Sequence, residues 1–244
     1  MPRADGRRVG ELRPITIQRH FSSRAPGSVL IQWGGTHVLC TACISEGVPG
    51  WRAGGGLGWL TAEYDMLPGA TQTRRPRNRQ RIDGRTQEIQ RLIGRALRAV
   101  VAFANLGEHT LQIDCDVIRA DGGTRTAAIT GAYVAARDAI RSARRAKLIS
   151  RDPFVGAVAA VSVGRVNGRV LLDLDYSEDV QAEVDMNVAM TDAGEFIEVQ
   201  GTGEESTFTR QDLDRMLRAA GRGIGELLRL QQRALRRPGG RTNG

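Results

Sequence analysis

Residues 121–126 of this 244-residue chain read Asp-Gly-Gly-Thr-Arg-Thr and combine groups that suit the binding of an anion. The two glycines allow a sharp turn and a close approach of the backbone to a ligand. The small, apolar run at 127–139 predicts a helix, whose first N–H groups would have no partner inside it. Together with the Arg125 guanidinium and the hydroxyls of Thr124 and Thr126, this turn predicts a phosphate-binding site. A plain strand-to-helix turn with a solvated arginine is the alternative.

Arg85 is a second candidate for holding the same anion. Apolar residues recur at helical spacing and predict an amphipathic helix over residues 86–104. A cation just before the first turn gains nothing from the helix dipole, which favours anions at that end. An anion bound between Arg85 and the helix start would remove this conflict, and so would a nearby carboxylate. The residues alone leave both explanations open.

A cluster of six carboxylates lies between residues 173 and 185. Hard cations such as Mg²⁺ or Mn²⁺ take carboxylate oxygens as ligands, so the cluster is a candidate metal site. Asp179 and Asp185 form the best pair, because Asp179 ends a predicted loop and Asp185 starts a predicted strand. A solvated acidic loop that pairs with nearby arginines is the alternative. The cluster consists of Asp173, Asp175, Glu178, Asp179, Glu183 and Asp185.

The densest positive charge lies in residues 74–81, which we call the arginine loop. This loop and the formal net charge of +8 favour a polyanion such as nucleic acid as the partner. For any single arginine, a solvated position is the alternative. Because only 5% of the residues are aromatic, we expect contacts mainly to phosphates, with little sequence preference. The loop contains Arg74, Arg75, Arg77, Arg79 and Arg81.

Several other kinds of chemistry find little support. The chain has no G-x-x-x-x-G-K-[ST] motif, no G-x-S-x-G and three histidines, which argues against a P-loop enzyme and a serine hydrolase. Cys40 and Cys43 form a C-x-x-C in a predicted strand, where residues three apart face opposite sides and do not share a zinc. We see no signal peptide and no apolar run near the ~20 residues of a membrane span, so we expect a cytoplasmic protein.

Strands and helices are expected in two similar sets, which predicts an α+β protein with two halves. In the first half, two strands form a hairpin about Gly34-Gly35, a third follows at 59–64, and the alternating strand at 111–117 leads into the anion turn. A basic connection at 137–151 is expected to separate the halves, at about 1–140 and 152–235.

The second half is expected to contain two hairpins and a long helix. The turns are predicted at Asn167-Gly168 and at residues 192–194. Thr209 and Asp212 resemble a capping box that begins the final amphipathic helix. The tail at 236–244 is expected to be disordered.

From residue 3 to about residue 230, the chain resembles the ribonuclease PH family of phosphate-dependent exoribonucleases. The resemblance rests on many motifs that occur in the family's order. They include D-G-R at 5–7, V-L-C-T-A at 38–42, E-G-V-P at 46–49, T-A-E-Y at 61–64, G-R-T at 84–86, E-I-Q-R-L-I at 88–93, D-C-D-V at 114–117, D-M-N-V at 185–188 and E-V-Q-G-T at 198–202.

The resemblance implies a fold, an activity and a site. The fold would be the ribonuclease PH fold, a single domain over residues 1–244 with two βαβα-type halves related to domain 2 of ribosomal protein S5. Family members form hexameric rings, as trimers of dimers, and remove nucleotides from the 3′ ends of tRNA precursors and other RNA with inorganic phosphate, releasing nucleoside diphosphates. The arginine loop would guide the RNA. The phosphate-binding residues would be Arg85, Gly123, Thr124 and Arg125, and the catalytic and metal-binding pair Asp179 and Asp185.

One alternative is a protein with the same fold but without catalytic activity. Some relatives are non-catalytic RNA-binding ring subunits, which lose the phosphate-binding arginines or the aspartate pair. This chain retains both groups, which favours the enzyme.

Overall fold

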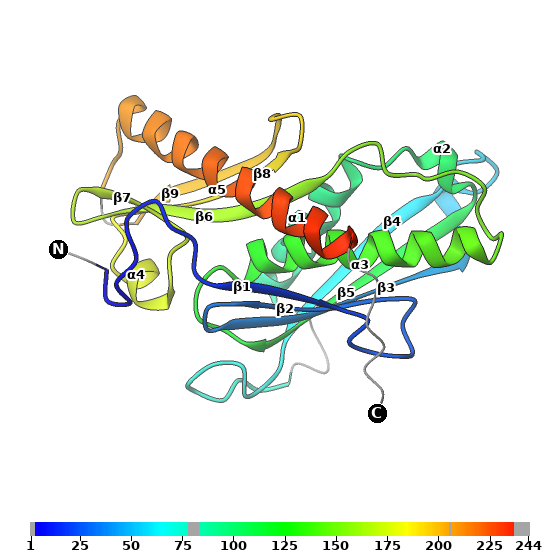
Figure 1. Cartoon of the computed structure of the whole chain (residues 1–244), viewed down its shortest axis with the longest axis horizontal. Coiled ribbons are helices and arrows are strands. Elements are labelled where there is room, and N and C mark those ends of the chain that lie inside the picture. The colour runs from blue at the N-terminus through cyan, green and yellow to red at the C-terminus, as the bar shows by residue number, and fades with distance from the viewer. Residues whose placement is uncertain (1–2, 78–82, 205, 237–244) are drawn as a thin grey trace.

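Two β-sheets lie on either side of a central helix, α3 (Thr124–Arg145), in the computed structural model (Figure 1). The model describes residues 3–77, 83–204 and 206–236. Helix α3 packs against strands of both sheets. Most of its residues are buried, because alanine and glycine let the neighbouring strands approach closely. One hydrophobic core therefore runs through both halves of the chain.

The first sheet has five strands in the order β1-β2-β3-β5-β4. The predicted hairpin at Gly34-Gly35 is confirmed, since β2 and β3 pair there in antiparallel register. Strands β4 and β5 are parallel and are connected through helix α1 (Gly84–Arg98) and the short helix α2 (Phe103–Leu106). The strands are β1 (Ile15–Arg19), β2 (Gly27–Trp33), β3 (Thr36–Glu46), β4 (Trp59–Met66) and β5 (His109–Arg119).

The second sheet has four antiparallel strands in the order β7-β6-β8-β9. Both predicted hairpins are confirmed. At the first turn, Asn167 and Gly168 have φ angles of 49° and 70°, which suit a tight hairpin. The strands are β6 (Val158–Val166), β7 (Arg169–Leu172), β8 (Val184–Thr191) and β9 (Phe196–Gly203). The helix α4 (Tyr176–Val180) lies between β7 and β8 in the chain.

Helix α5 (Arg210–Arg236) covers strands β6, β7 and β8 with its apolar face. The predicted capping pair is confirmed. The Thr209 N–H donates to Asp212 Oδ2 at 3.0 Å, and the Asp212 N–H donates to Thr209 Oγ1 at 3.2 Å. Among the described residues, no helix is both long and apolar enough to span a membrane. The mixed α and β architecture agrees with the expected fold class.

Three predicted boundaries were wrong. Helix α1 covers 84–98 in place of 86–104, because Val101 pairs with Phe154 in an isolated bridge and the backbone there leaves the helix. The basic residues of the expected connection at 137–151 lie largely in α3, which continues to Arg145, so the connection begins later than expected. The expected tail began at Arg236, which belongs to α5, and residues 237–244 lie outside the described part.

Candidate functional site

The carboxyl ends of β4 and β5 bring the two predicted anion-binding segments together. The two strands are parallel, so they end at the same edge of the sheet. Helices α1 and α3 both begin beyond that edge. The Asp83 carboxylate caps α1 by accepting from the Thr86 N–H, so it is the first N–H groups of α3 that favour an anion there. Arg85 lies in the first turn of α1, and Gly123, Thr124 and Arg125 begin α3. Arg85 and Arg125 both act to lower the pKa of Asp179, so both guanidinium groups lie near that carboxyl group.

The glycines of the anion turn are required by geometry. Gly122 and Gly123 have φ angles of 75° and 65°, which glycine adopts without strain. A Cβ on Gly122 would lie 2.7 Å from the carbonyl oxygen of Leu174. The turn therefore lies directly against the segment that leads into α4. Within the described part of the chain, no side chain caps the N-terminus of α3, which leaves its first N–H groups available to a ligand.

Thr124 is oriented by Tyr64, a residue that the sequence analysis assigned only to a strand. The hydroxyl groups of the two residues form a hydrogen bond of 2.8 Å. Tyr64 is buried, and burial raises its pKa to about 12, so that its hydroxyl stays protonated. A protonated phenol can donate to Thr124 Oγ1 and leave the threonine's own proton for an anion.

Arg125 is held by two side chains to which the sequence analysis assigned no role. Its Nη1 donates to Gln200 Oε1 at 2.7 Å and to Glu88 Oε1 at 3.4 Å. Gln200 Nε2 also donates to Glu88 Oε1 at 3.1 Å. The three residues come from α3, β9 and α1, so their proximity could not be read from sequence spacing.

The acidic cluster divides into carboxylates with and without basic partners. Glu178 accepts two hydrogen bonds from Arg3, at 2.7 and 2.5 Å. Asp173 is 1% exposed and pairs with Arg13, and Glu183 pairs with Arg165. These residues agree with the alternative prediction, in which the acidic side chains pair with nearby arginines and stabilise the fold. Asp175 also stabilises the fold, because it caps α4 by accepting from the Glu178 N–H.

Asp179 and Asp185 have no ion pair with any described basic residue. Oδ1 of Asp185 is buried and has no hydrogen-bond partner among the described residues. Burial and the charge of Asp179 raise the pKa of Asp185. Asp179 is an exposed residue, yet partial desolvation raises its pKa against the opposing effects of Arg85 and Arg125. Asp179 lies inside α4, so the prediction that it ends a loop was wrong.

The aspartate pair suits a divalent cation that keeps much of its water shell. The described residues contain no group of three or more His, Cys, Asp or Glu side chains that could enclose a metal ion. Two carboxylates, one with an unpartnered buried oxygen, match the way proteins bind Mg²⁺, through one or two carboxylates plus waters and phosphate oxygens.

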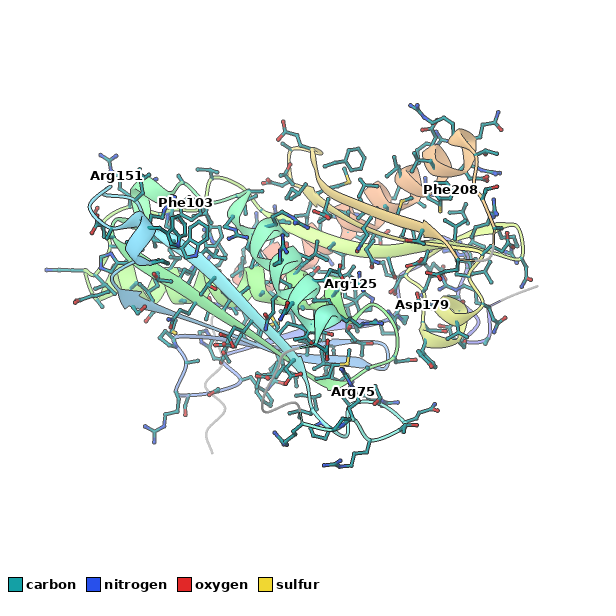
Figure 2. All side chains as sticks on the ribbon, turned by 180° about the vertical axis from the view of Figure 1, so that it is seen from behind. Arg75, Phe103, Arg125, Arg151, Asp179 and Phe208 are labelled. Atoms are coloured by element: carbon teal, nitrogen blue, oxygen red, sulfur yellow. The ribbon has the colours of Figure 1, made fainter. Side chains whose placement is uncertain are left out.

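The described part of the arginine loop lies beside the start of α1. Arg74 and Arg77 are exposed. Arg75, labelled in Figure 2 together with Arg125 and Asp179, pairs with Asp83 at 3.2 Å. Asp83 in turn caps α1 by accepting from the Thr86 N–H. Arg79 and Arg81 lie outside the described residues.

The cysteines lie away from this chemistry. Cys40 is buried and Cys43 is partly exposed on the other face of β3, as predicted. Cys115 is the register partner of Cys40, and all three cysteines are free.

Comparison with known proteins gives a consistent result. Models of the 3′ exoribonuclease family match the chain, domain 1 over residues 11–141 and domain 2 over residues 156–223. A protein named ribonuclease PH from Mycolicibacterium smegmatis is 58% identical over 97% of this chain and 92% of its own length. Its namesake from Rhodococcus erythropolis is 56% identical with the same coverage.

Solved structures share the fold at much lower identity. The Archaeoglobus fulgidus exosome with RNA bound to the active site has a TM-score of 0.77 and 20% identity, over 93% of this chain and 92% of that one. An archaeal exosome core has a TM-score of 0.76 and 19% identity, over 95% and 91% of the two chains.

Proposed function

The chain belongs to the ribonuclease PH family of 3′ exoribonucleases, and from this premise we propose how its site performs the reaction. The protein is a phosphorolytic 3′-to-5′ exoribonuclease. It binds RNA, including the 3′ ends of tRNA precursors, and uses inorganic phosphate to release nucleoside diphosphates in a reversible nucleotidyl transfer. Phosphate is itself the nucleophile, so no serine, cysteine or histidine nucleophile is needed.

Arg85, Gly123, Thr124 and Arg125 are proposed to hold the attacking phosphate. An oxygen of this phosphate forms a bond to the phosphorus of the terminal phosphodiester, and the bond from that phosphorus to the 3′-oxygen of the preceding nucleotide breaks. The guanidinium groups and the N–H groups of α3 hold the phosphate in line and offset the negative charge of the transition state. This assignment is supported by the N-terminus of α3, which no described side chain caps, and by Arg85 in the first turn of α1, at the same edge of the first sheet.

Asp179 is proposed to donate a proton to the leaving 3′-oxygen. A carboxyl group with a raised pKa holds its proton closer to neutral pH, which suits a general acid. Asp185 lies close enough to interact with Asp179, whose negative charge raises the pKa of Asp185 in turn. Together the two residues would hold Mg²⁺ or Mn²⁺, which would supply charge neutralisation for the phosphoryl oxygens.

The observation that carries the proposal is the pair of aspartates without ion pairs beside the two arginines at the helix N-termini. It also argues against a non-catalytic ring subunit, which would not need to retain a buried, unpartnered carboxylate oxygen. The test is product analysis on a short RNA labelled within its chain, with Mg²⁺ and with or without phosphate. We expect nucleoside diphosphates only when phosphate is present. Monophosphates released without phosphate would indicate a hydrolase and contradict the phosphate site.

The arginine loop is proposed to guide RNA toward the site. It follows β4 and precedes Arg85, so a strand bound there would approach the phosphate site. RNA affinity should fall steeply with salt, because each neutralised phosphate releases counterions. A flat salt response would remove this role.

The assembly is proposed to be a hexameric ring, a trimer of dimers, and its location the cytoplasm. The ring proposal follows from family membership and predicts six times the 26.5 kDa mass of one chain in solution. We also propose that residues 1–244 act as one domain, which is supported by the core shared between the halves. Multi-angle light scattering and a single unfolding transition would test the two statements.

A further inference from the structure

Glu88, Arg125 and Gln200 form a closed hydrogen-bonded bridge between the two halves. Arg125 Nη1 donates to both partners, and Gln200 Nε2 donates to the same Glu88 oxygen, Oε1. Gln200 belongs to the second half, whereas Arg125 and Glu88 belong to the first. The bridge thus joins the proposed phosphate ligand to strand β9.

The bridge uses only one nitrogen of the Arg125 guanidinium. A guanidinium has five N–H donors in one plane, and two of its nitrogens can bind an oxyanion as a fork. Both hydrogen bonds that Arg125 makes with described residues come from Nη1, which leaves Nε and Nη2 for phosphate. A guanidinium held at Nη1 presents that remaining edge in a fixed plane, so less entropy is lost when phosphate binds.

The polarity of the Gln200 amide is required by its two partners. Its oxygen accepts from the cation Arg125, and its nitrogen donates to the anion Glu88. A glutamate at this position could not donate to Glu88 and would place a second negative charge beside the phosphate. A methionine would fill similar space without either hydrogen bond.

Gln200 also lies on the strand pair that carries Asp185. In the β8–β9 register, Asn187 is the partner of Gln200 and Asp185 is the partner of Thr202. Residues two apart on a strand face the same side, so Asp185 and Gln200 project from the same face of the pair. Holding Arg125 on Gln200 therefore fixes the phosphate ligand relative to the aspartate.

We propose that Gln200 and Glu88 are positioning residues that orient Arg125 for phosphate and align the bound phosphate with the Asp179 and Asp185 pair. This inference rests on the proposed phosphorolytic function. It assigns the two residues no contact with substrate, and their effect is exerted through Arg125.

Gln200→Met is the main test, and Glu198→Met is its matched control. Glu198 lies two residues earlier on the same face of β9 and also contacts α1, through a 3.0 Å ion pair with Arg95. It does not touch Arg125. We expect Gln200→Met to raise the phosphate KM about tenfold, the scale of a lost hydrogen bond to a charged group, and to lower kcat at saturating phosphate. Glu198→Met should change neither quantity.

Gln200→Glu separates orientation from simple packing. It keeps the side-chain length and adds a negative charge, so the phosphate KM should rise further than in Gln200→Met, while thermal stability stays close to that of the parent protein. Phosphate KM and kcat values for Gln200→Met that match those of Glu198→Met would contradict the proposal that Gln200 positions Arg125. Arg125→Ala is measured in parallel: if this variant keeps the parent's phosphate KM, the phosphate site itself is wrong, whereas a raised KM in Arg125→Ala alone contradicts only the bridge.

Discussion

Asp173 and Asp185 belong to the same acidic stretch, but the surroundings of Asp173 stabilise its negative charge and those of Asp185 disfavour it. The carboxylate of Asp173 accepts from Arg13 Nη2 at 2.7 Å and from the Trp33 indole N–H at 2.8 Å. Burial alone would lower the pKa of Arg13, but Asp173 outweighs it and raises that pKa. Asp185 has a buried oxygen without a hydrogen bond and the negative charge of Asp179 nearby.

The difference separates carboxylates that hold the fold from carboxylates that are available for chemistry. Asp173 joins Arg13, near the start of the chain, to the loop that follows β7, and Arg13 also donates to the Asp121 carbonyl of the anion turn. Arg13 and Trp33 occupy the carboxylate oxygens of Asp173, so few of its lone pairs are free to bind a ligand. The surroundings of Asp185 disfavour its negative charge, and a bound cation or proton would stabilise it. Such a group is expected at a functional site.

The largest effect that tests this comparison is the loss of activity in Asp179→Asn and Asp185→Asn. Each change keeps the shape of the side chain and removes the carboxylate. Loss of a positioned acid–base group typically costs about 10²–10⁴-fold in rate, and kcat for phosphorolysis should fall within that range in both variants. The variants should still bind RNA, as measured by fluorescence anisotropy. A near-normal kcat in either one would remove that residue from the mechanism.

Asp173→Ala should show the opposite behaviour, with a large loss of stability. Removing one partner of a buried ion pair leaves an uncompensated charge on Arg13 and costs about 3–5 kcal/mol. Urea unfolding measures the loss. Asp173→Asn should be less destabilising, because an amide oxygen can still accept from Trp33. If Asp173→Ala unfolds like the parent protein, the carboxylate does not hold the halves together as the geometry implies.

Much of the fold could be predicted from local patterns. The alternation of apolar and polar residues, together with turn residues, predicted all three hairpins correctly. Turns such as Asn167-Gly168 depend only on the few residues that form them. The ends of α1 and α3 could not be predicted in the same way. The backbone at Val101 is decided by its bridge to Phe154, and Arg137 is accommodated in α3 by an ion pair with Asp152, which lies beyond the end of the helix.

The candidate site also contains features that local sequence predicts and features that only the tertiary fold determines. Gly122, Gly123 and Arg125 could be identified because their conformations and charges are local properties. The role of Arg3 and Arg13 in neutralising Glu178 and Asp173 could not, because these partners meet only through the tertiary fold. The sequence did favour Asp179 and Asp185 within the acidic cluster, but one of its reasons was wrong, because Asp179 lies in α4 and does not end a loop.

A smaller effect sharpens the comparison through pH. Because the pKa of Asp185 is raised in the folded protein, the folded state binds this proton more tightly than the unfolded state. Stability from this group is therefore present at low pH and is lost as the pH rises from the unfolded value, about 3.9, through the raised folded value. Asp185→Asn removes the charged form and should increase the free energy of unfolding at pH 7 by about 1–3 kcal/mol, the cost of a buried unpaired group.

The measurement is urea unfolding of Asp185→Asn and the parent protein at pH 4 and pH 7, with EDTA present so that no cation offsets the charge. The stability difference should be larger at pH 7. A variant that is less stable than the parent at pH 7 would mean that the Asp185 carboxylate is satisfied by its surroundings, and the contrast with Asp173 would fail.

Tyr64→Phe should produce the smallest effect, because it changes only the orientation of Thr124, a proposed phosphate ligand. Phenylalanine keeps the buried ring and removes the hydroxyl that bonds Thr124. Thr124 can then turn its hydroxyl away from the anion, and a net hydrogen-bond contribution of about 1 kcal/mol corresponds to roughly a fivefold rise in phosphate KM. Tyr133→Phe is the matched control, since Tyr133 is also buried and its hydroxyl bonds the Gly156 carbonyl at 3.3 Å. Equal phosphate KM values in the two variants would show that Thr124 needs no partner, and the phosphate would then depend on the arginines and the helix N-termini alone.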